Sequence, residues 1–280
     1  MTRKKTVEEI VASLNIIDDT LFQKMAEDMG FCEELLTTVL QQKVIVEEVI
    51  PQNSIKNLQG RSVVLDALCV LEDGKRCNVE VQKANDDNHE KRVRYNTSCI
   101  TANITDPGTK FELVPNVIGI FISKFDMFKK AKTIYHVDRT VRETGDVVDN
   151  GLQEIYVNTK IDDGSDLAEL MKIYKERSVF DYQKFPKTSK RKGQFIRNEG
   201  GKREMCELVE NYARQVAEEE AAKAAAKAAA EAAAKARKEA EESARSLFEN
   251  GVDFEVVCRS IKTFSREELQ SIYEKVQANK

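Results

Sequence analysis

Two short β-strand patterns, close together in the chain, constrain its fold more than any other segment. The first, residues 61–71, reads RSVVLDALCVL, and the second, residues 76–82, reads RCNVEVQ. Alternation along the second run places three apolar side chains on one face and Asn78, Glu80 and Gln82 on the other. The four residues between the runs include an Asp-Gly pair, which is a common turn signal. The sequence therefore predicts an antiparallel β-hairpin.

The length of the turn decides which residues face one another across this hairpin. A two-residue loop would set Asp66 opposite the apolar Val81. A three-residue loop that ends in Gly74, in the left-handed conformation, sets Asp66 opposite Glu80. The second register gives one continuous apolar face, so we expect it. Its apolar pairs are Leu65 with Val81, Ala67 with Val79 and Cys69 with Cys77.

Asp66 and Glu80 are like charges in this register, and opposed like charges cost stability. A hard divalent cation such as Mg²⁺ would remove the repulsion, since it binds one or two carboxylates and keeps several waters. The alternative is an ordinary solvated sheet face, on which acidic residues are common. Val64, Leu68 and Val70 share the face of Asp66, which argues against full solvation. The residue pattern leaves both interpretations open.

The residues around the acid pair resemble a known family. Asp66 followed by Glu80-Val81-Gln82 is similar to the core of the PD-(D/E)xK nucleases, in the variant in which Gln replaces the usual Lys. The resemblance to the transposases of this nuclease family, which are related to the recombination-promoting nucleases of bacteria, extends from about residue 18 to about residue 209. The motifs that carry it are DALC (66–69), NVEVQK (78–83), HEKRVRY (89–95) and IYH (134–136).

The resemblance implies a restriction-endonuclease-like α/β core, with a mixed central sheet flanked by helices, and metal-dependent endonuclease activity on DNA. It assigns catalysis to Asp66, Glu80 and Gln82, and metal binding to Asp66, Glu80 and the Val81 carbonyl. Mg²⁺ is the implied cofactor, and Mn²⁺ is expected to substitute. Gln82 can hydrogen-bond to water but cannot abstract a proton, so water activation would depend on the metal. The same departure from Lys supports an alternative, a catalytically silent nuclease fold that binds DNA or oligomerises.

A basic helix is expected after the hairpin, over residues 88–103. It carries Arg92, Arg94 and Tyr95, and the resemblance places this helix beside the active centre, where these side chains would contact DNA. The alternative is a solvated basic helix face.

Residues 184–203 form a second candidate for contact with DNA. They hold eight basic residues and one acid, and three glycines argue against regular structure. We expect a flexible basic loop that neutralises phosphates and becomes ordered on binding. Its central basic residues are Lys190, Arg191 and Lys192.

Two further groups of residues concern the chemistry of the site. Asp19, Glu27 and Asp28, on the expected N-terminal helices, are candidates for an additional acid, and the sequence does not select among them. His136 is expected to be a hydrogen-bonded core histidine rather than a catalytic base.

Changes in pattern along the chain predict four segments. They are N-terminal helices over 1–43, the nuclease core over 44–204, an Ala-rich exposed helix over 205–246 and a small helical cap over 247–280. Residues 221–238 lack large apolar side chains, so this long helical extension is neither a core helix nor a heptad zipper. The same Glu-Ala-Ala-Ala-Lys pattern occurs in engineered rigid linkers.

Composition narrows the classes of function. The net charge of −4 shows no global basic signature, but DNA binding depends on the local density of Lys and Arg. The six cysteines form no CxxC pair and there are two histidines, which argues against a structural zinc site. No apolar run reaches membrane-spanning length. We therefore expect a cytoplasmic protein with no membrane association. DNA as its partner is what the family resemblance implies, since the residues alone do not separate DNA from RNA, and a homodimer is a further expectation.

Overall fold

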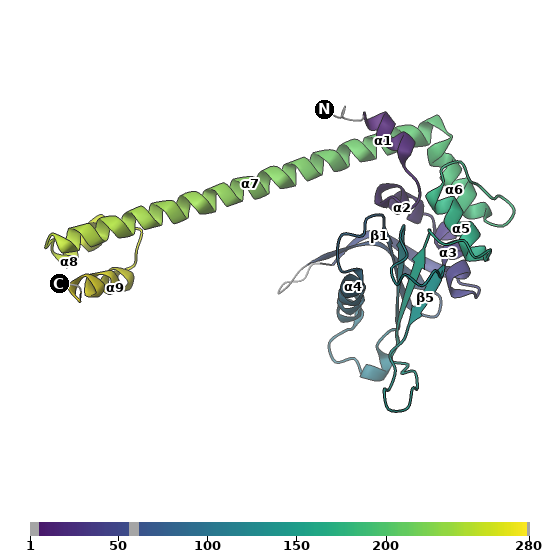
Figure 1. Cartoon of the computed structure of the whole chain (residues 1–280), viewed down its shortest axis with the longest axis horizontal. Helices are drawn as coiled ribbons and strands as arrows, with labels where there is room; N and C mark the ends of the chain where they lie inside the picture. Colours follow the sequence, from purple (N-terminus) through teal and green to yellow (C-terminus); the bar gives the residue numbers. More distant parts are fainter. Residues whose placement is uncertain (1–5, 56–61, 279–280) are drawn as a thin grey trace. The chain divides into compact units, whose positions relative to one another are not determined.

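The structure is a computed structural model that describes residues 6–55 and 62–278. Within these residues it contains a six-stranded mixed sheet in the order β1-β2-β3-β4-β6-β5, flanked by helices (Figure 1). Arg61, expected to open the hairpin, lies outside the described residues. The strands are β1 (Val46–Ile55), β2 (Val63–Leu71), β3 (Arg76–Gln82), β4 (Val117–Ser123), β5 (Ile134–Val137) and β6 (Leu152–Asn158). This sheet with its flanking helices confirms the predicted restriction-endonuclease-like α/β core.

The helices precede, separate and follow the strands. They are α1 (Val7–Ser13), α2 (Asp19–Ala26), α3 (Met29–Leu40), α4 (His89–Ile104), the 3₁₀ helix η1 (Phe111–Leu113), α5 (Asp166–Lys175), α6 (Pro186–Ile196), α7 (Glu199–Glu249), α8 (Phe254–Ser260) and α9 (Arg266–Gln277). The length of α7 confirms the expected C-terminal helical extension.

The β2–β3 hairpin adopts the three-residue turn. Ala67 pairs with Val79 and Cys69 pairs with Cys77. The turn ends at Gly74, whose φ of +80° is the left-handed conformation that such a turn requires at its third position. This register is the predicted one, and the ladder that the strands form ends at the Ala67–Val79 pair, one residue before Asp66 and Glu80.

The ladder between β2 and β3 ends at Asp66. Asp66 Oδ2 accepts a hydrogen bond from the Val81 N–H at 2.9 Å, so this carboxylate takes the donor that would otherwise continue the ladder. Leu65 packs in the cluster beneath α4, whereas Val81 packs in the main core on the other face of the sheet. The predicted stack of Leu65 on Val81 is therefore wrong, because β2 separates from β3 at the acid.

The two faces of the sheet are covered by different helices. Helix α4 covers one face, and α2, α3 and α5 lie on the other (Figure 1). Side chains of α2, α3 and α5 form the main core, and those of α4 pack in two smaller clusters on the opposite face. Every residue of β4 is buried, as expected for a central strand with a near-continuous apolar sequence. Strands β3, β4 and β6 run parallel, so their carboxyl ends lie side by side along one edge of the sheet, the edge formed by strand ends rather than by an outermost strand. The N-terminal end of α4 follows β3 at that edge.

The segment expected to be a flexible basic loop, residues 184–203, is largely helical. It contains α6 and the beginning of α7. A Cβ atom on Gly201 would lie 2.0 Å from the carbonyl oxygen of Gln194, so the backbones of the two helices meet where only glycine fits. The prediction of a loop is wrong because this glycine permits a helix–helix contact instead of a turn.

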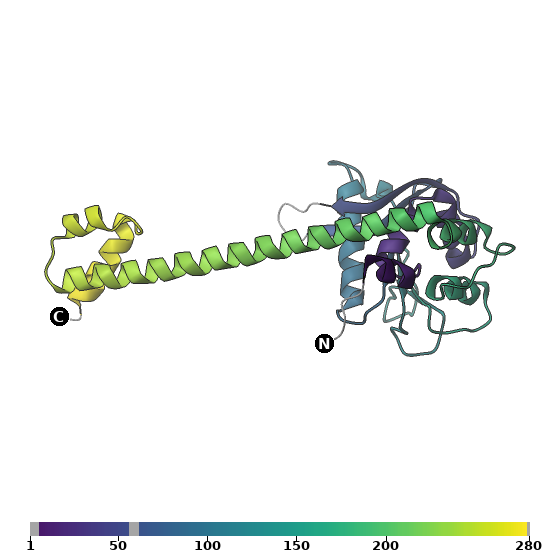
Figure 2. The same ribbon diagram turned by 90° about the horizontal axis from the view of Figure 1, so that it is seen from above.

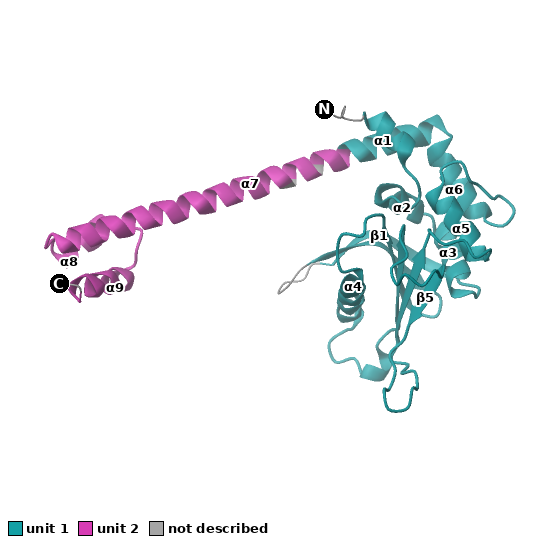
Figure 3. Cartoon of the chain, in the orientation of Figure 1, with its two compact units in different colours: residues 1–210 teal, residues 211–280 magenta. Residues whose placement is uncertain are grey.

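The chain divides into two compact units, residues 1–210 and 211–280 (Figure 3). In the second unit, α8 and α9 pack with the end of α7 (Figure 2) around Phe248, Phe254 and Tyr273. Residues 220–239 of α7 are exposed, in agreement with their lack of large apolar side chains. No helix in the described part of the chain has both the length and the apolar character needed to cross a membrane.

Candidate active site

Asp66 is a buried acid at the point where β2 separates from β3. The residue is 6% exposed. Its Oδ1 accepts a hydrogen bond from Gln23 of α2 at 3.3 Å, and its Oδ2 accepts from the Val81 N–H. Burial, together with the neighbouring Glu80 carboxylate, raises the pKa of Asp66 to about 7. A cation beside this carboxyl group would favour its ionised form.

Glu80 is more deeply buried than Asp66, at 1% exposed. Its Oε1 accepts from Asn78 at 3.1 Å, and its Oε2 accepts from Arg92 Nη2 at 2.9 Å. Burial raises the pKa of Glu80, while the positive charge of Arg92 opposes this shift. Arg92 therefore compensates part of the negative charge of the site.

The side-chain amide of Gln82 is oriented by its neighbours. Its Oε1 accepts from Arg92 Nη1 at 3.0 Å. Its Nε2 donates to the Ala84 carbonyl at 3.0 Å and to Asp86 Oδ1 at 3.4 Å. Both amide protons are thus engaged, and the oxygen keeps one lone pair. Gln82 can therefore orient a water molecule only as an acceptor.

The structure selects one of the three further acids that the sequence left open. Asp19, the first residue of α2, lies close enough to Asp66 and Arg92 for their charges to interact. Although Asp19 is an exposed residue, partial burial of its carboxyl group raises its pKa, and the Arg92 charge opposes that shift. Glu27 forms ion pairs near the other end of α2, and Asp28 caps α3. Of the three, Asp19 is therefore the acid that lies near the candidate site.

The donor atoms of the site suit a hard divalent cation. Asp66 and Glu80 supply carboxylate oxygens, and the Val81 carbonyl points to the same side as its N–H, toward Asp66. Burial is the main cause that raises the pKa values of both acids, and Arg92 contacts only Glu80 of the two carboxyl groups. Oxygen ligands of this kind match Mg²⁺ or Mn²⁺. Among the described residues no cluster of three His, Cys, Asp or Glu side chains forms a metal site, so carbonyl oxygen and water would complete the coordination.

The structure brings together the DNA-contact residues predicted on α4. Arg92, Arg94 and Tyr95 line one groove of about 630 Å³ with Lys91 and the start of β2. Arg94 is exposed and Tyr95 is half-buried. Because Arg92 also holds Glu80, this groove adjoins the buried acids.

The three residues predicted to contact DNA from the basic segment, Lys190, Arg191 and Lys192, differ in their exposure and in their contacts. Lys192 is fully buried, and its Nζ donates to three carbonyl oxygens at and just beyond the C-terminal end of α5, at 2.6–2.9 Å. Arg191 donates to the Lys24 carbonyl at 2.9 Å, and Lys190 is exposed. The prediction that Lys192 contacts DNA is wrong, because this ammonium group stabilises the end of a helix.

The two histidines lie in different environments. His136 is exposed on β5, at one edge of the sheet, so its assignment to the core is wrong. His89, in the first turn of α4, is 2% exposed, and neither of its ring nitrogens has a hydrogen-bond partner among the described residues. Its ring instead lies 5.1 Å from that of Phe121 and 5.4 Å from that of Phe125.

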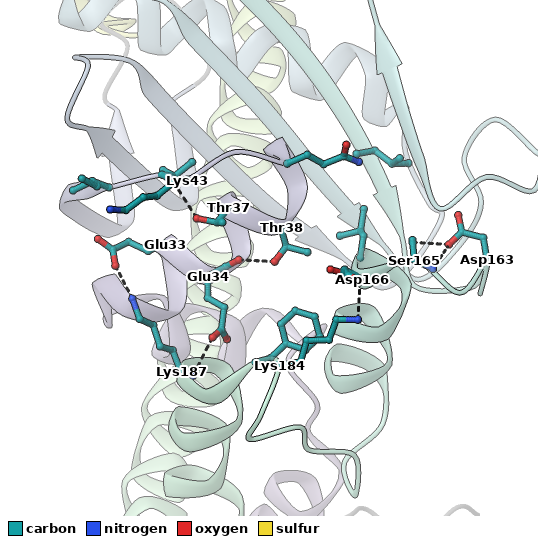
Figure 4. Close-up of a pocket in the computed structure, with 16 residues that line it drawn as sticks. Glu33, Glu34, Thr37, Thr38, Lys43, Asp163, Ser165, Asp166, Lys184 and Lys187 are labelled. Carbon is teal, nitrogen blue, oxygen red and sulfur yellow. Dashed lines mark hydrogen bonds and ion pairs between the residues drawn. The ribbon is translucent and has the colours of Figure 1, made fainter.

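A larger cavity, of about 890 Å³, lies between α3, α5 and the start of α6 (Figure 4). Several of its charged side chains form ion pairs: Lys187 with Glu33 at 2.7 Å, and Lys184 with Asp166 at 2.6 Å. The Glu34 carboxylate accepts from two backbone N–H groups at the start of α6, at 2.8 and 3.1 Å. These pairings join helices, so we do not assign catalysis to this cavity.

The chain matches the model of a known family. A family model described as PD-(D/E)XK nuclease family transposase matches residues 21–247. Searches among curated proteins and among solved structures give no match. The matched span contains Asp66, Glu80, Gln82 and Arg92, whereas Asp19 lies two residues before its start.

Proposed function

Because this chain belongs to the PD-(D/E)XK nuclease family transposases, we propose that it is a metal-dependent endonuclease that hydrolyses phosphodiester bonds in DNA. The observation that carries the proposal is the buried pair of acids, Asp66 and Glu80, where β2 and β3 separate. Two buried like charges lower stability unless a positive charge accompanies them. Arg92 contacts only Glu80 of the pair. Its charge therefore compensates one carboxylate, and a bound cation would compensate the other.

Each residue of the site has a separate role in this proposal. Asp66, Glu80 and the Val81 carbonyl would hold Mg²⁺, or Mn²⁺ in its place, and the bound ion would lower the pKa of a water ligand and neutralise charge on the phosphate. Gln82 Oε1 orients the attacking water by accepting a hydrogen bond from it. Arg92 holds both Glu80 and Gln82 in place, and Arg94 contacts the DNA backbone from the adjoining groove.

A second candidate function is a catalytically silent nuclease fold that binds DNA. The observation that favours it is Gln82, whose amide carries no charge and has both of its protons engaged within the protein. In this reading Gln82 cannot donate to the phosphate or remove a proton from water.

Nicking of supercoiled plasmid separates the two functions. We expect wild-type protein to nick DNA with Mg²⁺, and we expect activity to be lost with chelator and in Glu80→Gln. Asp73→Asn is the matched control, because Asp73 is a half-exposed acid in the hairpin turn that pairs with Lys75. Absence of nicking with both Mg²⁺ and Mn²⁺, while DNA is still retained on a gel, would establish the silent binding protein.

Arg92 provides a second test of the same site. In Arg92→Gln we expect the nicking rate near neutral pH to fall about 100-fold, as when one preorganised donor is removed from an active site. Loss of the guanidinium also raises the pKa of Glu80 further, so the acidic limb of the pH–rate profile should move to higher pH. Arg94→Gln, on the same helix, should leave that limb in place. An unchanged acidic limb in Arg92→Gln would show that Arg92 does not compensate Glu80.

A further inference from the structure

A group of lysines lies at the carboxyl ends of β4 and β6, and the sequence analysis did not single it out. All of its members are exposed. Within residues 6–55 and 62–278, none of them lies within ion-pair distance of a carboxylate, although Lys160 is close enough to Asp126 for its charge to help lower the pKa of that carboxyl group. We call this group the lysine cluster; it consists of Lys124, Lys129, Lys130, Lys132 and Lys160.

The lysine cluster lies at the same edge of the sheet as the candidate active site. Ser123, the last residue of β4, pairs with Gln82 on one side and Asn158 on the other. The Lys124 N–H donates to the Gln82 carbonyl at 3.0 Å. Neighbouring strands are about 5 Å apart, so the cluster begins about one strand spacing from Gln82, and Lys160 follows β6 about two spacings away.

The loop that carries four of these lysines, residues 124–132, also packs on the face of the sheet that α4 covers. The ring of Phe128 lies 5.0 Å from that of Tyr135 and 5.2 Å from that of Tyr156. The ring of Phe125 contacts His89 of α4 at 5.4 Å. Because Arg92 projects from the same helix onto Glu80, the loop and the acids share one face as well as one edge.

The backbone of this loop is held in place by side chains. Asp126 accepts hydrogen bonds from the Lys129 N–H at 3.0 Å, the Ala131 N–H at 2.8 Å and the Tyr135 hydroxyl at 2.6 Å. Lys129 and Ala131 have φ values of +56° and +54°, a region that residues other than glycine occupy only when their surroundings impose it. The lysines thus project from an ordered platform.

We propose that the lysine cluster binds the phosphates of DNA that flank the scissile bond, and so positions the duplex on the active site. The proposal rests on the function proposed above and names a contact surface for its substrate. Lysine binds phosphate as a point charge, and a row of unpaired ammonium groups matches the repeated charges of a nucleic-acid backbone. Other lysines of the first unit are paired with carboxylates instead; examples are Lys24, Lys83, Lys172, Lys184 and Lys187.

The salt dependence of DNA binding tests the proposal without requiring cleavage. The variant is Lys129→Ala/Lys130→Ala/Lys132→Ala. The control is Lys43→Ala/Lys238→Ala/Lys275→Ala, which removes the same charge from exposed lysines outside the cluster and outside the segments predicted to contact DNA. Binding of a labelled duplex would be followed by fluorescence anisotropy, with Ca²⁺ and with chelator, between 50 and 200 mM salt, after thermal melting has shown that both variants are folded.

We expect the cluster variant to lose about tenfold or more in affinity at low salt. The slope of log K against log salt should become shallower by about 2 to 3, since each lost phosphate contact reduces it by about 0.9. The control variant should keep the wild-type slope.

The outcomes separate this proposal from the proposed hydrolysis. Equal slopes for the two variants would overturn the role of the lysine cluster, even if the wild-type protein cleaves DNA. A shallower salt-dependence slope in the cluster variant, with no cleavage by the wild type in any metal, would support the DNA contact and overturn the proposed nuclease activity. Failure of the wild type to bind DNA at all would overturn both.

Discussion

Replacing Asp66 by Asn is expected to abolish metal-dependent cleavage and, in the same variant, to stabilise the metal-free protein at pH 8. The amide oxygen can still accept the Val81 N–H, so the end of the β2–β3 ladder is preserved. The substitution removes the negative charge that lies near Glu80 and that burial makes costly. We expect the rate of cleavage to fall by about 1,000-fold or more, for two reasons. An amide is a poor ligand for Mg²⁺ at this position, and the site loses a negative charge that would balance the charge of the bound cation.

The stabilisation should depend on pH in a defined direction. The pKa of Asp66 is about 7 in the folded protein and about 4 in an unfolded chain. Between these values the folded state binds more protons, so the stability that protonated Asp66 contributes is lost as the pH rises through 7. The difference corresponds to about 4 kcal/mol at most. We therefore expect Asp66→Asn to be more stable than wild type by about 2 to 4 kcal/mol at pH 8, and by much less at pH 5.

Thermal unfolding in the presence of chelator, at pH 5 and pH 8, measures this effect. Asp73→Asn serves again as the control and should show no comparable gain at either pH. If Asp66→Asn is instead less stable than wild type at pH 8, the Asp66 carboxylate stabilises the folded protein. The interpretation that this acid lowers stability and is present for function would then be wrong.

Replacing Lys192 by Met is expected to destabilise the first unit by about 3 to 5 kcal/mol, the cost of breaking a buried charged interaction. The Nζ atom satisfies three carbonyl oxygens around the end of α5, and methionine fills a similar space without any donor. Burial lowers the pKa of Lys192 to about 8, so near pH 7 the group remains an ammonium ion with three N–H donors. Removing it leaves buried carbonyl groups without partners, each at a cost of about 1 kcal/mol or more.

Urea unfolding at pH 7, followed by circular dichroism, measures the loss. Lys190→Met is the matched control two residues earlier, and we expect its stability to stay within about 0.5 kcal/mol of wild type, as for most surface substitutions. A Lys192→Met protein as stable as wild type would show that the ammonium group does not hold the end of α5.

Several features of the site could be predicted from sequence because they depend on local rules. The period of two along a strand puts Glu80 and Gln82 on one face, and the turn that ends in Gly74 sets the register that aligns Asp66 with Glu80. Arg92 could be placed on the helix after the hairpin, and the family motifs point to the same residues. Each of these inferences uses residues that are close together in the chain.

Other features required the tertiary structure because they depend on contacts between distant segments. Asp19 was one of three equivalent acids until folding placed it near Asp66. Lys192 belongs to a basic run in the sequence, yet its burial beneath α5 makes it part of the core. Gly201 resembled a helix breaker, but it lies where two helices touch.

The sequence by itself determined the hairpin, the acid pair and the family, since strand periodicity, turn geometry and motif order are properties of short segments. Only the tertiary structure decided which charges are buried, which are paired and which remain exposed. The lysine cluster illustrates the difference, because its members follow two separate strands, β4 and β6. Burial and ion pairing result from the packing of segments that are remote in the chain, and these determine the pKa values and the charged surfaces of the site.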